Sequence, residues 1–241
     1  MEKMCGALME AFMEEYPNVT VTTEYTGSGA GIESVTSGAV DIGNASRALS
    51  DKEKSAGIEE NIVAIDGIAM ITDKNNKVTN VTKQQLTDIY TGKITNWKEV
   101  GGADEAIVLI TRPESSGTRA TFKKYALDGA SEASNKSMET DDSGVLLQNV
   151  KTTKGAIGYV ALSYLVSNPG VDTVSIDGVE PTLENTYAGK YPVWTYEHMY
   201  TKGNADEVSQ KFLDYIMSDE YGKKMEALGY GVSSKMTVKE H

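Results

Sequence analysis

Twice in this chain, a strand-like run of residues ends in a turn rich in Gly, Ser and Thr, and a helical pattern follows the turn at once. The first turn, at residues 26–31, follows the alternating β-branched run 19–25. The second turn, at residues 113–117, follows the apolar run 107–112. Alternating residues predict a strand, whereas apolar residues spaced three and four apart predict a helix. This rhythm of strand, loop and helix predicts an α/β protein.

The rest of the chain continues the same alternation of elements. Capping residues, Gly and Pro positions and apolar spacing predict where the elements begin and end. Further strands are expected at residues 40–43, 62–72, 155–160 and 191–196. Helices are expected at residues 4–16, 32–38, 81–90, 118–127, 145–150, 205–217 and 219–228, and a turn-rich stretch at 173–189.

The length of 241 residues allows one large domain or two lobes of about 100 residues each. No apolar run approaches the ~20 residues that span a bilayer, and the first residues lack the pattern of a signal peptide. A trimmed secreted chain would also lack that pattern, so the compartment stays open at this point. The single cysteine, Cys5, excludes an internal disulfide, and the apolar spacing around it predicts a buried thiol.

The net charge is −12, with 35 acidic side chains against 23 basic ones. A protein that binds the nucleic-acid backbone needs a basic face, so this balance argues against a nucleic-acid partner. It does not argue against a small anionic ligand. Small-anion sites depend on a few aimed N–H groups and a guanidinium rather than on the field of the whole protein.

The first turn has the spacing Gly27-x-Gly29-x-Gly31 and leads into a helix. The first amides of a helix have no intrahelical partner, and the helix dipole adds positive charge there, so an oxyanion is a natural ligand. The Ser28 hydroxyl could donate one more hydrogen bond. The spacing does not match the full dinucleotide fingerprint, because Ile32 stands where a glycine is needed. A capping loop without a ligand is the alternative.

The second turn is the more specific of the two. Arg112 stands four residues before Ser116, and Ser116, Gly117 and Thr118 open a helix. A guanidinium offers two parallel donors to a tetrahedral oxyanion, and glycine lets the backbone approach closely. A plain helix cap with a surface arginine is the alternative interpretation.

A third candidate follows the expected strand that ends at Gly43. Ser46 could cap a helix or bind a ligand, and Arg47 could reach the same ligand. Arg47 could equally pair with one of the many carboxylates of the chain. The sequence leaves both interpretations of Arg47 open.

An enzyme is not expected from this set of residues. The two histidines are His198, for which we expect a structural role, and His241 at the terminus, so a triad through Ser116 would be strained. No Walker run and no Cys/His metal spacing occurs, so we expect neither a cofactor nor a metal. Asp141 and Asp142 could hold a cation weakly, but a solvated loop is the simpler interpretation.

Four segments in this order carry a resemblance: Tyr25–Gly31, Val40–Gly43, Arg112–Thr118 and Gly155–Tyr159. Together they resemble the phosphate-binding component of the phosphate ABC importer, over nearly the whole chain. The resemblance implies the type II periplasmic-binding-protein fold, with two α/β lobes joined by two crossings and phosphate buried between them. Residues 1–70 and 186–241 are then expected to form lobe 1, and residues 71–185 lobe 2.

The resemblance also implies a site and a role. Its phosphate-contacting positions correspond to Ser28, Ser46, Arg112, Ser116, Gly117 and Thr118, and we add Arg47 as a neighbour. The implied protein is an extracellular or periplasmic monomer that captures inorganic phosphate by hinge closure, without covalent chemistry, and passes it to a membrane permease. A lipid anchor outside this chain is expected to hold it at the membrane.

The chain departs from the family pattern in two places. Some members have an aspartate at the position of Ser46 that accepts the proton of phosphate, and here Glu114 could instead orient Arg112 or supply an acceptor. The family also opens with a strand and a Gly/Ser/Thr loop, and the chain as written begins at the expected next helix. We therefore expect tighter phosphate binding, measured by calorimetry, once that segment is added. Sulfate, molybdate, tungstate or a small carboxylate remain alternative ligands, and an adhesin or a phosphate-ester hydrolase remain alternative functions.

Overall fold

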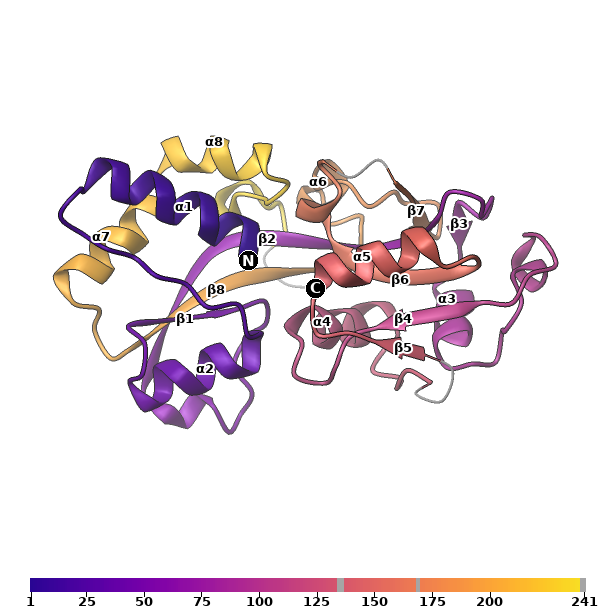
Figure 1. Cartoon of the computed structure of the whole chain (residues 1–241), viewed down its shortest axis with the longest axis horizontal. Helices are drawn as coiled ribbons and strands as arrows, with labels where there is room; N and C mark the ends of the chain where they lie inside the picture. The colour runs from indigo at the N-terminus through magenta and orange to yellow at the C-terminus, as the bar shows by residue number, and fades with distance from the viewer. Residues whose placement is uncertain (134–136, 168–169, 239–241) are drawn as a thin grey trace. The chain divides into compact units, whose positions relative to one another are not determined.

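A computed structural model describes residues 1–133, 137–167 and 170–238 of the chain (Figure 1). The chain forms two units: unit 1 contains Met1–Asp66 and Thr195–Lys235, and unit 2 contains Gly67–Trp194 and Met236–His241. The expected lobe limits, at residues 70 and 185, both fall inside unit 2. Residues 186–194 belong there because Tyr191 and Val193 hydrogen-bond to Ile68 and pack in the unit 2 core.

Unit 1 consists of a small antiparallel sheet with helices packed on it. Its sheet has the order β1-β8-β2, and β1 pairs with β8 so that Ala45 lies opposite His198. An apolar cluster joins α1, α7 and α8 to β2 and β8, with Leu8, Phe12 and Leu213 fully buried. A second cluster, with Ile32 and Val35, packs α2 on β1. The elements are α1 (Glu2–Glu15), α2 (Ser28–Ser37), β1 (Ile42–Ala45), the 3₁₀ turns Lys54–Ala56 and Ser233–Lys235, β2 (Ile58–Asp73, shared with unit 2), β8 (Trp194–Lys202, shared at its first residue), α7 (Glu207–Ile216) and α8 (Asp219–Ala227).

Unit 2 is built on a mixed sheet with the order β2-β6-β4-β5, and β7 pairs with β2 and β3. Strand β4 runs parallel to β5 and β6, whereas β2 runs antiparallel to β6 and β7. The elements are β3 (Asn80–Val81), α3 (Lys83–Tyr90), β4 (Val108–Thr111), α4 (Gly117–Ala126), β5 (Ser137–Glu139), α5 (Ser143–Thr152), β6 (Ala156–Ala161), β7 (Val171–Ile176), α6 (Leu183–Tyr187) and the 3₁₀ turns Trp97–Val100 and Leu162–Tyr164.

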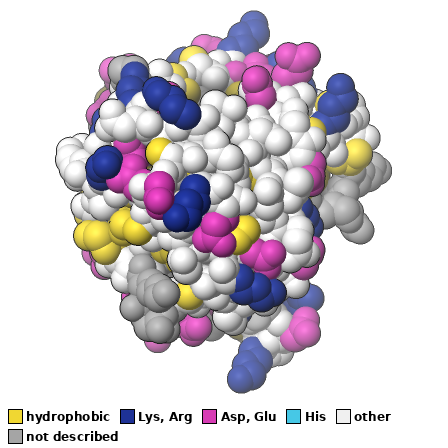
Figure 2. Space-filling model, turned by 90° about the vertical axis from the view of Figure 1, so that its right-hand side faces the viewer, with side chains coloured by type: hydrophobic (Ala, Val, Ile, Leu, Met, Phe, Trp, Pro, Cys, Tyr) yellow, Lys and Arg dark blue, Asp and Glu magenta, His cyan; other side chains and the backbone are white. Residues whose placement is uncertain are grey.

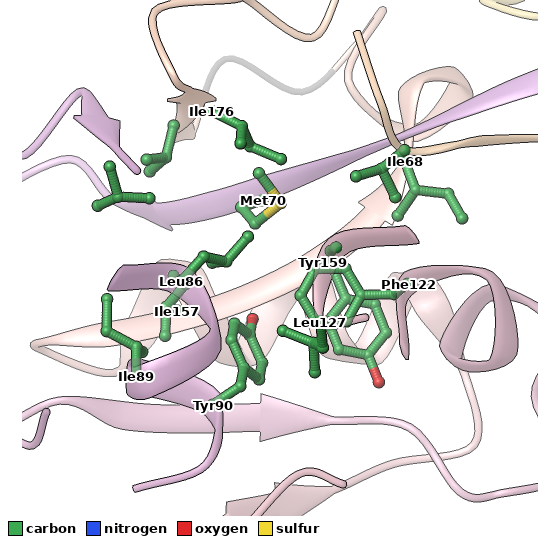
Figure 3. Packing of buried hydrophobic residues seen from close by; sticks show 14 of the residues in the cluster. Ile68, Met70, Leu86, Ile89, Tyr90, Phe122, Leu127, Ile157, Tyr159 and Ile176 are labelled. Carbon is green, nitrogen blue, oxygen red and sulfur yellow. The ribbon is translucent and has the colours of Figure 1, made fainter. Parts of the chain in front are cut away.

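Both faces of the unit 2 sheet are buried along β4, β6 and the second half of β2, which explains why these segments are almost continuously apolar. Successive side chains of a strand point to opposite faces. Met70 and Tyr159 accordingly lie in one core cluster, whereas Ile71 and Val160 lie in the other. In the first cluster the Phe122 ring stacks on Tyr159 at 4.2 Å between ring centres (Figure 3). These two clusters hold β4, the strand that precedes α4, because Leu109 lies in the first cluster and Ile110 in the second.

Most expected helices and strands are confirmed because their signals are local. For example, α3 begins with a complete capping box, in which Thr82 and Gln85 satisfy each other's backbone amides. Ser116 and Asp142 cap α4 and α5 with their side chains. Each accepts a hydrogen bond from an amide three residues on.

Two expectations about elements were wrong. Residues 19–25 form no strand, although Val19 and Val21 pack against the unit 1 core as the alternation predicts. Alternation indicates which side chains are buried, but a strand also needs a partner for its backbone groups. The turn-rich stretch 173–189 contains most of β7 and all of α6. The expected strand at 40–43 lies two residues further on, at Ile42–Ala45.

Candidate anion-binding site

The unit 1 candidates meet where the start of α2 lies against the end of β1. Gly27 has a φ of 89°, a left-handed conformation that favours glycine, and it turns the chain into α2 at Ser28. The Ser28 side chain is buried, and its Oγ accepts a hydrogen bond of 3.0 Å from the Ser46 amide. Because Ser28 Oγ already accepts, its own proton remains to donate to a ligand. The first amides of α2 are further donors.

Two glycines bring Ser28 and Ser46 together. A Cβ at Gly31 would lie 2.5 Å from the Asn44 carbonyl oxygen, and a Cβ at Gly43 would lie 2.5 Å from the Gly31 oxygen. Helix α2 can therefore approach β1 this closely only without those side chains. The third glycine of the sequence motif serves helix–strand packing.

Ser46 is also tied to a residue that the sequence analysis did not single out, Glu197 on β8. The Ser46 hydroxyl donates to Glu197 Oε2 at 2.8 Å. Glu197 is 0% exposed, and Asp66 beside it is also buried. Burial raises the pKa of Glu197, and the Met1 ammonium group and hydrogen bonds with Ser46 and Asp66 oppose this. The sequence signal was an acidic residue in a strand that also carries the aromatic residues Trp194, Tyr196 and Tyr200.

Arg47 lies beside Ser46 but is engaged elsewhere. Its guanidinium makes a two-pronged ion pair with Glu53, at 2.8 and 2.9 Å, and also donates to the Ala48 carbonyl. The hydrogen bond from Arg47 lowers the pKa of Glu53 to about 2. The structure thus gives Arg47 the carboxylate partner that the sequence left as one of two alternatives.

In unit 2 the start of α4 presents several donors together. Ser116 is buried and its Oγ accepts from the Arg119 amide at 3.3 Å, so the hydroxyl proton remains to donate. The Ser116 amide is bound to the Pro113 carbonyl. Gly117 and Thr118 form the first turn of α4, where amides lack intrahelical acceptors.

Arg112 directly follows β4, the strand that leads into this turn, and it is only 8% exposed. Its guanidinium donates to the Ser143 hydroxyl and, at 2.6 Å, to the Asp141 carbonyl. Its Nε is buried and has no hydrogen-bond partner within the part of the chain that the structure describes. Burial lowers the pKa of Arg112, which marks a desolvated cation. The expected orientation of Arg112 by Glu114 is wrong, because Glu114 is exposed and Ser143 and Asp141 hold the guanidinium.

A second arginine supports the first. Arg119 donates to the Arg112 carbonyl and lies 3.6 Å from the buried carboxylate of Glu132. Tyr159 connects the same groups, because its hydroxyl accepts from the Arg112 amide and donates to Glu132. Burial raises the pKa of Glu132 to about 6. Sequence reasoning missed the roles of Arg119, Glu132 and Ser143, since their contacts join different elements of unit 2, between 7 and 31 residues apart.

Known proteins resemble this chain over most of its length. The family model of the PBP superfamily domain matches residues 1–220. The phosphate-binding protein PstS of Bacillus subtilis is 43% identical over 227 residues, which cover 93% of this chain and 75% of that protein. The chain belongs to the PstS family.

Solved structures agree with this membership. A Clostridium perfringens protein described as a phosphate ABC transporter substrate-binding protein, solved with bound phosphate, matches with a TM-score of 0.90 and 38% identity. The alignment covers 98% of this chain and 95% of that one. An ABC-type phosphate transport receptor from Vibrio cholerae matches with a TM-score of 0.79 and 28% identity, covering 95% of each chain. The α/β binding-protein fold expected from the sequence is confirmed.

The other residues considered from the sequence have structural places in this PstS-family chain. His198 is buried, lies 3.0 Å from Glu60 and stacks on Tyr200. Cys5 is buried as expected, and burial raises the pKa of its thiol to about 11. Asp142 caps α5. His241 lies outside the described residues.

Three further properties of the described residues concern metal sites, membrane-spanning helices and surface charge. They contain no cluster of three or more His, Cys, Asp or Glu that could hold a metal ion. Within the same ranges, no helix has both the length and the apolar character to cross a membrane. On the face drawn in Figure 2, basic and acidic side chains are interspersed, and no basic patch gathers there.

Proposed function

We propose that this PstS-family chain captures inorganic phosphate and delivers it to the membrane permease of an ABC importer. The observation that carries the proposal is Arg112, a buried guanidinium with an unpartnered Nε, four residues before the donors that open α4. A buried cation whose donor lacks a partner is costly unless a ligand pairs with it. The names and bound phosphate of the relatives support phosphate as that ligand.

The proposed contacts are Ser28 and Ser46 in unit 1, and Arg112, Ser116, Gly117 and Thr118 in unit 2. Each of these two clusters offers a serine hydroxyl and first-turn amides, which are donors that oxyanion sites use. We expect each cluster to contribute to phosphate binding. Arg47 is not included, because both terminal nitrogens of its guanidinium donate to the Glu53 carboxylate.

Capture and release of phosphate require this chain to make or break no covalent bond, so we propose a binding protein without catalytic activity. PstS-type proteins act outside the cytoplasm, and we propose the same for this chain, as a monomer. A lipid anchor would lie outside the 241 residues and stays a prediction.

A pair of arginine variants tests the proposal by calorimetry. Arg112→Ala removes charge-assisted hydrogen bonds worth about 1.5–3 kcal/mol each, so phosphate affinity should fall at least about 100-fold. Arg47→Ala also removes one guanidinium and serves as the matched control, with affinity within about threefold of the native value. Equal losses in the two variants would contradict the proposed site.

Ligand competition tests the identity of the anion. Saturating phosphate should raise the melting temperature by linkage, and sulfate, molybdate or tungstate at the same concentration should raise it far less. If another oxyanion stabilises the chain more than phosphate does, the chain is a binding protein for that oxyanion.

A further inference from the structure

The backbone N–H and C=O groups of Arg112 are both bound by side chains. Strand β4 ends at Thr111, so Arg112 is the first residue beyond it. The Arg112 amide donates to the Tyr159 hydroxyl at 3.2 Å, and the Arg112 carbonyl accepts from Nη1 of Arg119. These two hydrogen bonds lie on either side of the Arg112 Cα atom, from which the side chain leaves. They therefore restrain both the position of this atom and the direction of the side chain.

Glu132 joins the two groups that hold the Arg112 backbone. Its Oε1 accepts from the Tyr159 hydroxyl at 3.0 Å, and its Oε2 lies 3.6 Å from Nε of Arg119. A tyrosine hydroxyl has one proton, and because this proton goes to Glu132, an oxygen lone pair is left for the Arg112 amide. Glu132 and Tyr159 are buried, and the Arg119 side chain is only 14% exposed, so water competes little for these contacts.

The far end of the Arg112 side chain is held separately, at the start of α5. Its guanidinium donates to the Ser143 hydroxyl and to the Asp141 carbonyl. Both of these acceptors are uncharged, so neither hydrogen bond neutralises the guanidinium. A side chain that is held at both ends loses little further freedom when a ligand binds. The strength of a phosphate contact therefore depends on the backbone supports as well as on the guanidinium.

We infer that Tyr159 and Arg119 are positioning residues for phosphate binding. Joined by Glu132, they hold the Arg112 backbone where its guanidinium can meet the anion. The inference rests on the proposed function, because both residues act through Arg112. Neither of them needs to touch phosphate. The Arg119 guanidinium already contacts the Arg112 carbonyl and two carboxylates, those of Glu132 and, at 3.4 Å, Glu139.

A pair of tyrosine variants tests the inference. Tyr159→Phe removes the hydroxyl and retains the ring that stacks on Phe122 (Figure 3). The Arg112 amide then lacks its acceptor, and phosphate affinity, measured by equilibrium dialysis with radiolabelled phosphate, should fall about tenfold. Tyr191→Phe is the matched control, because Tyr191 is equally buried and its hydroxyl donates to the Ile68 carbonyl in the same unit. Both variants should lose stability in urea unfolding, but only Tyr159→Phe should lose affinity.

A double variant shows whether Tyr159 acts through Arg112. Arg112→Ala removes the guanidinium but keeps the backbone amide that Tyr159 binds. If Tyr159 only positions the guanidinium, Tyr159→Phe should not weaken phosphate binding further in the Arg112→Ala background. Its cost in stability should remain the same there. Equal losses of affinity in both backgrounds would mean that Tyr159 acts on the fold in general, which contradicts the inference.

Arg119→Lys separates position from charge. Lysine keeps the positive charge but lacks the planar fork of donors with which arginine contacts the Arg112 carbonyl and Glu132 at once. Phosphate affinity should therefore fall several-fold in this variant. Native affinity in Arg119→Lys would show that only the charge matters and would remove the positioning role of Arg119.

The failure of this inference differs from the failure of the function on which it rests. No phosphate binding by the native chain, or native affinity in Arg112→Ala, would overturn the proposed function and the inference together. Phosphate binding that depends on Arg112 but not on the Tyr159 hydroxyl would overturn the inference alone.

Discussion

Helix α2 packs so closely on β1 that a single methyl group at Gly31 should disturb both stability and binding. A Cβ at Gly31 would lie 2.5 Å from the Asn44 carbonyl oxygen and 3.2 Å from its amide nitrogen. Both contacts are to backbone atoms, which cannot rotate away as a flexible side chain can. In Gly31→Ala, α2 must therefore move away from β1 by on the order of 1 Å to reach ordinary contact distances.

The expected cost follows from two opposing effects. Overpacking typically costs about 1–3 kcal/mol, and the move also loosens the contacts of Ile32 and Val35 with their cluster. Alanine gains about 1 kcal/mol over glycine as a helix residue. We expect a net loss of about 1–2 kcal/mol in the free energy of unfolding.

Gly6 in α1 offers a matched control, because it is also a helical glycine. A Cβ there would meet only the Tyr25 hydroxyl, at 3.6 Å, which is ordinary contact. Gly6→Ala should therefore keep the helix gain and stabilise the chain by about 0.5–1 kcal/mol. The same chemical change should thus have opposite signs at the two positions.

Urea unfolding followed by far-ultraviolet circular dichroism measures both variants. Phosphate titration of Gly31→Ala adds a functional readout, since the hydrogen bond between Ser46 and Ser28 crosses the α2–β1 contact. Its phosphate affinity should fall several-fold, whereas that of Gly6→Ala should not change. Equal stability of Gly31→Ala and Gly6→Ala would show that the packing of α2 on β1 does not exclude a Cβ at Gly31.

Two further predictions concern groups that support Arg112. Burial raises the pKa of Glu132 to about 6 from a usual 4.5, so the folded state holds the Glu132 proton more tightly than the unfolded state does. The protonated side chain therefore stabilises the fold below pH 4.5, and this contribution is lost as the pH rises through 6. Relative to Glu132→Gln, native stability should therefore fall by about 1.5 kcal/mol between pH 4.5 and 6.5 in urea titrations, and parallel pH profiles would contradict this. Asp142→Ala removes the side chain that accepts a hydrogen bond from the Val145 amide at 2.7 Å, which should lower the free energy of unfolding by about 1 kcal/mol. Asp142→Asn should retain most of that stability. Equal stability of the two variants would exclude a capping role.

Elements with local signals were predictable from the sequence. Thr82 and Gln85 form the α3 cap within three residues, and Ser116 caps α4 over the same distance. Residues 19–25 show the limit of such signals. Their alternation matches the half-buried side chains of Val19, Val21 and Thr23. Whether these residues pair as a strand depends on a neighbour that alternation does not specify.

The two arginines show the same limit at the candidate site. Arg47 and Arg112 each follow a strand-like run and stand near serines, so the sequence pattern made both of them candidates for ligand binding. Arg47 finds Glu53 six residues away, whereas Arg112 is held by Asp141 and Ser143, 29 and 31 residues away. Whether each guanidinium is buried and keeps an unpaired donor depends on these partners. Only the folded chain shows which partners each arginine has.

The Gly, Ser and Thr turns by themselves determined where oxyanion donors should lie, because turns, caps and helix starts are short-range structures. What each donor has left to offer was decided by the tertiary structure. Ser46 and Glu197 are 151 residues apart in the chain, and the pairing of β1 with β8 brings them to 2.8 Å. A hydroxyl in the sequence is both a donor and an acceptor, and its partner in the fold determines which of the two remains for the ligand.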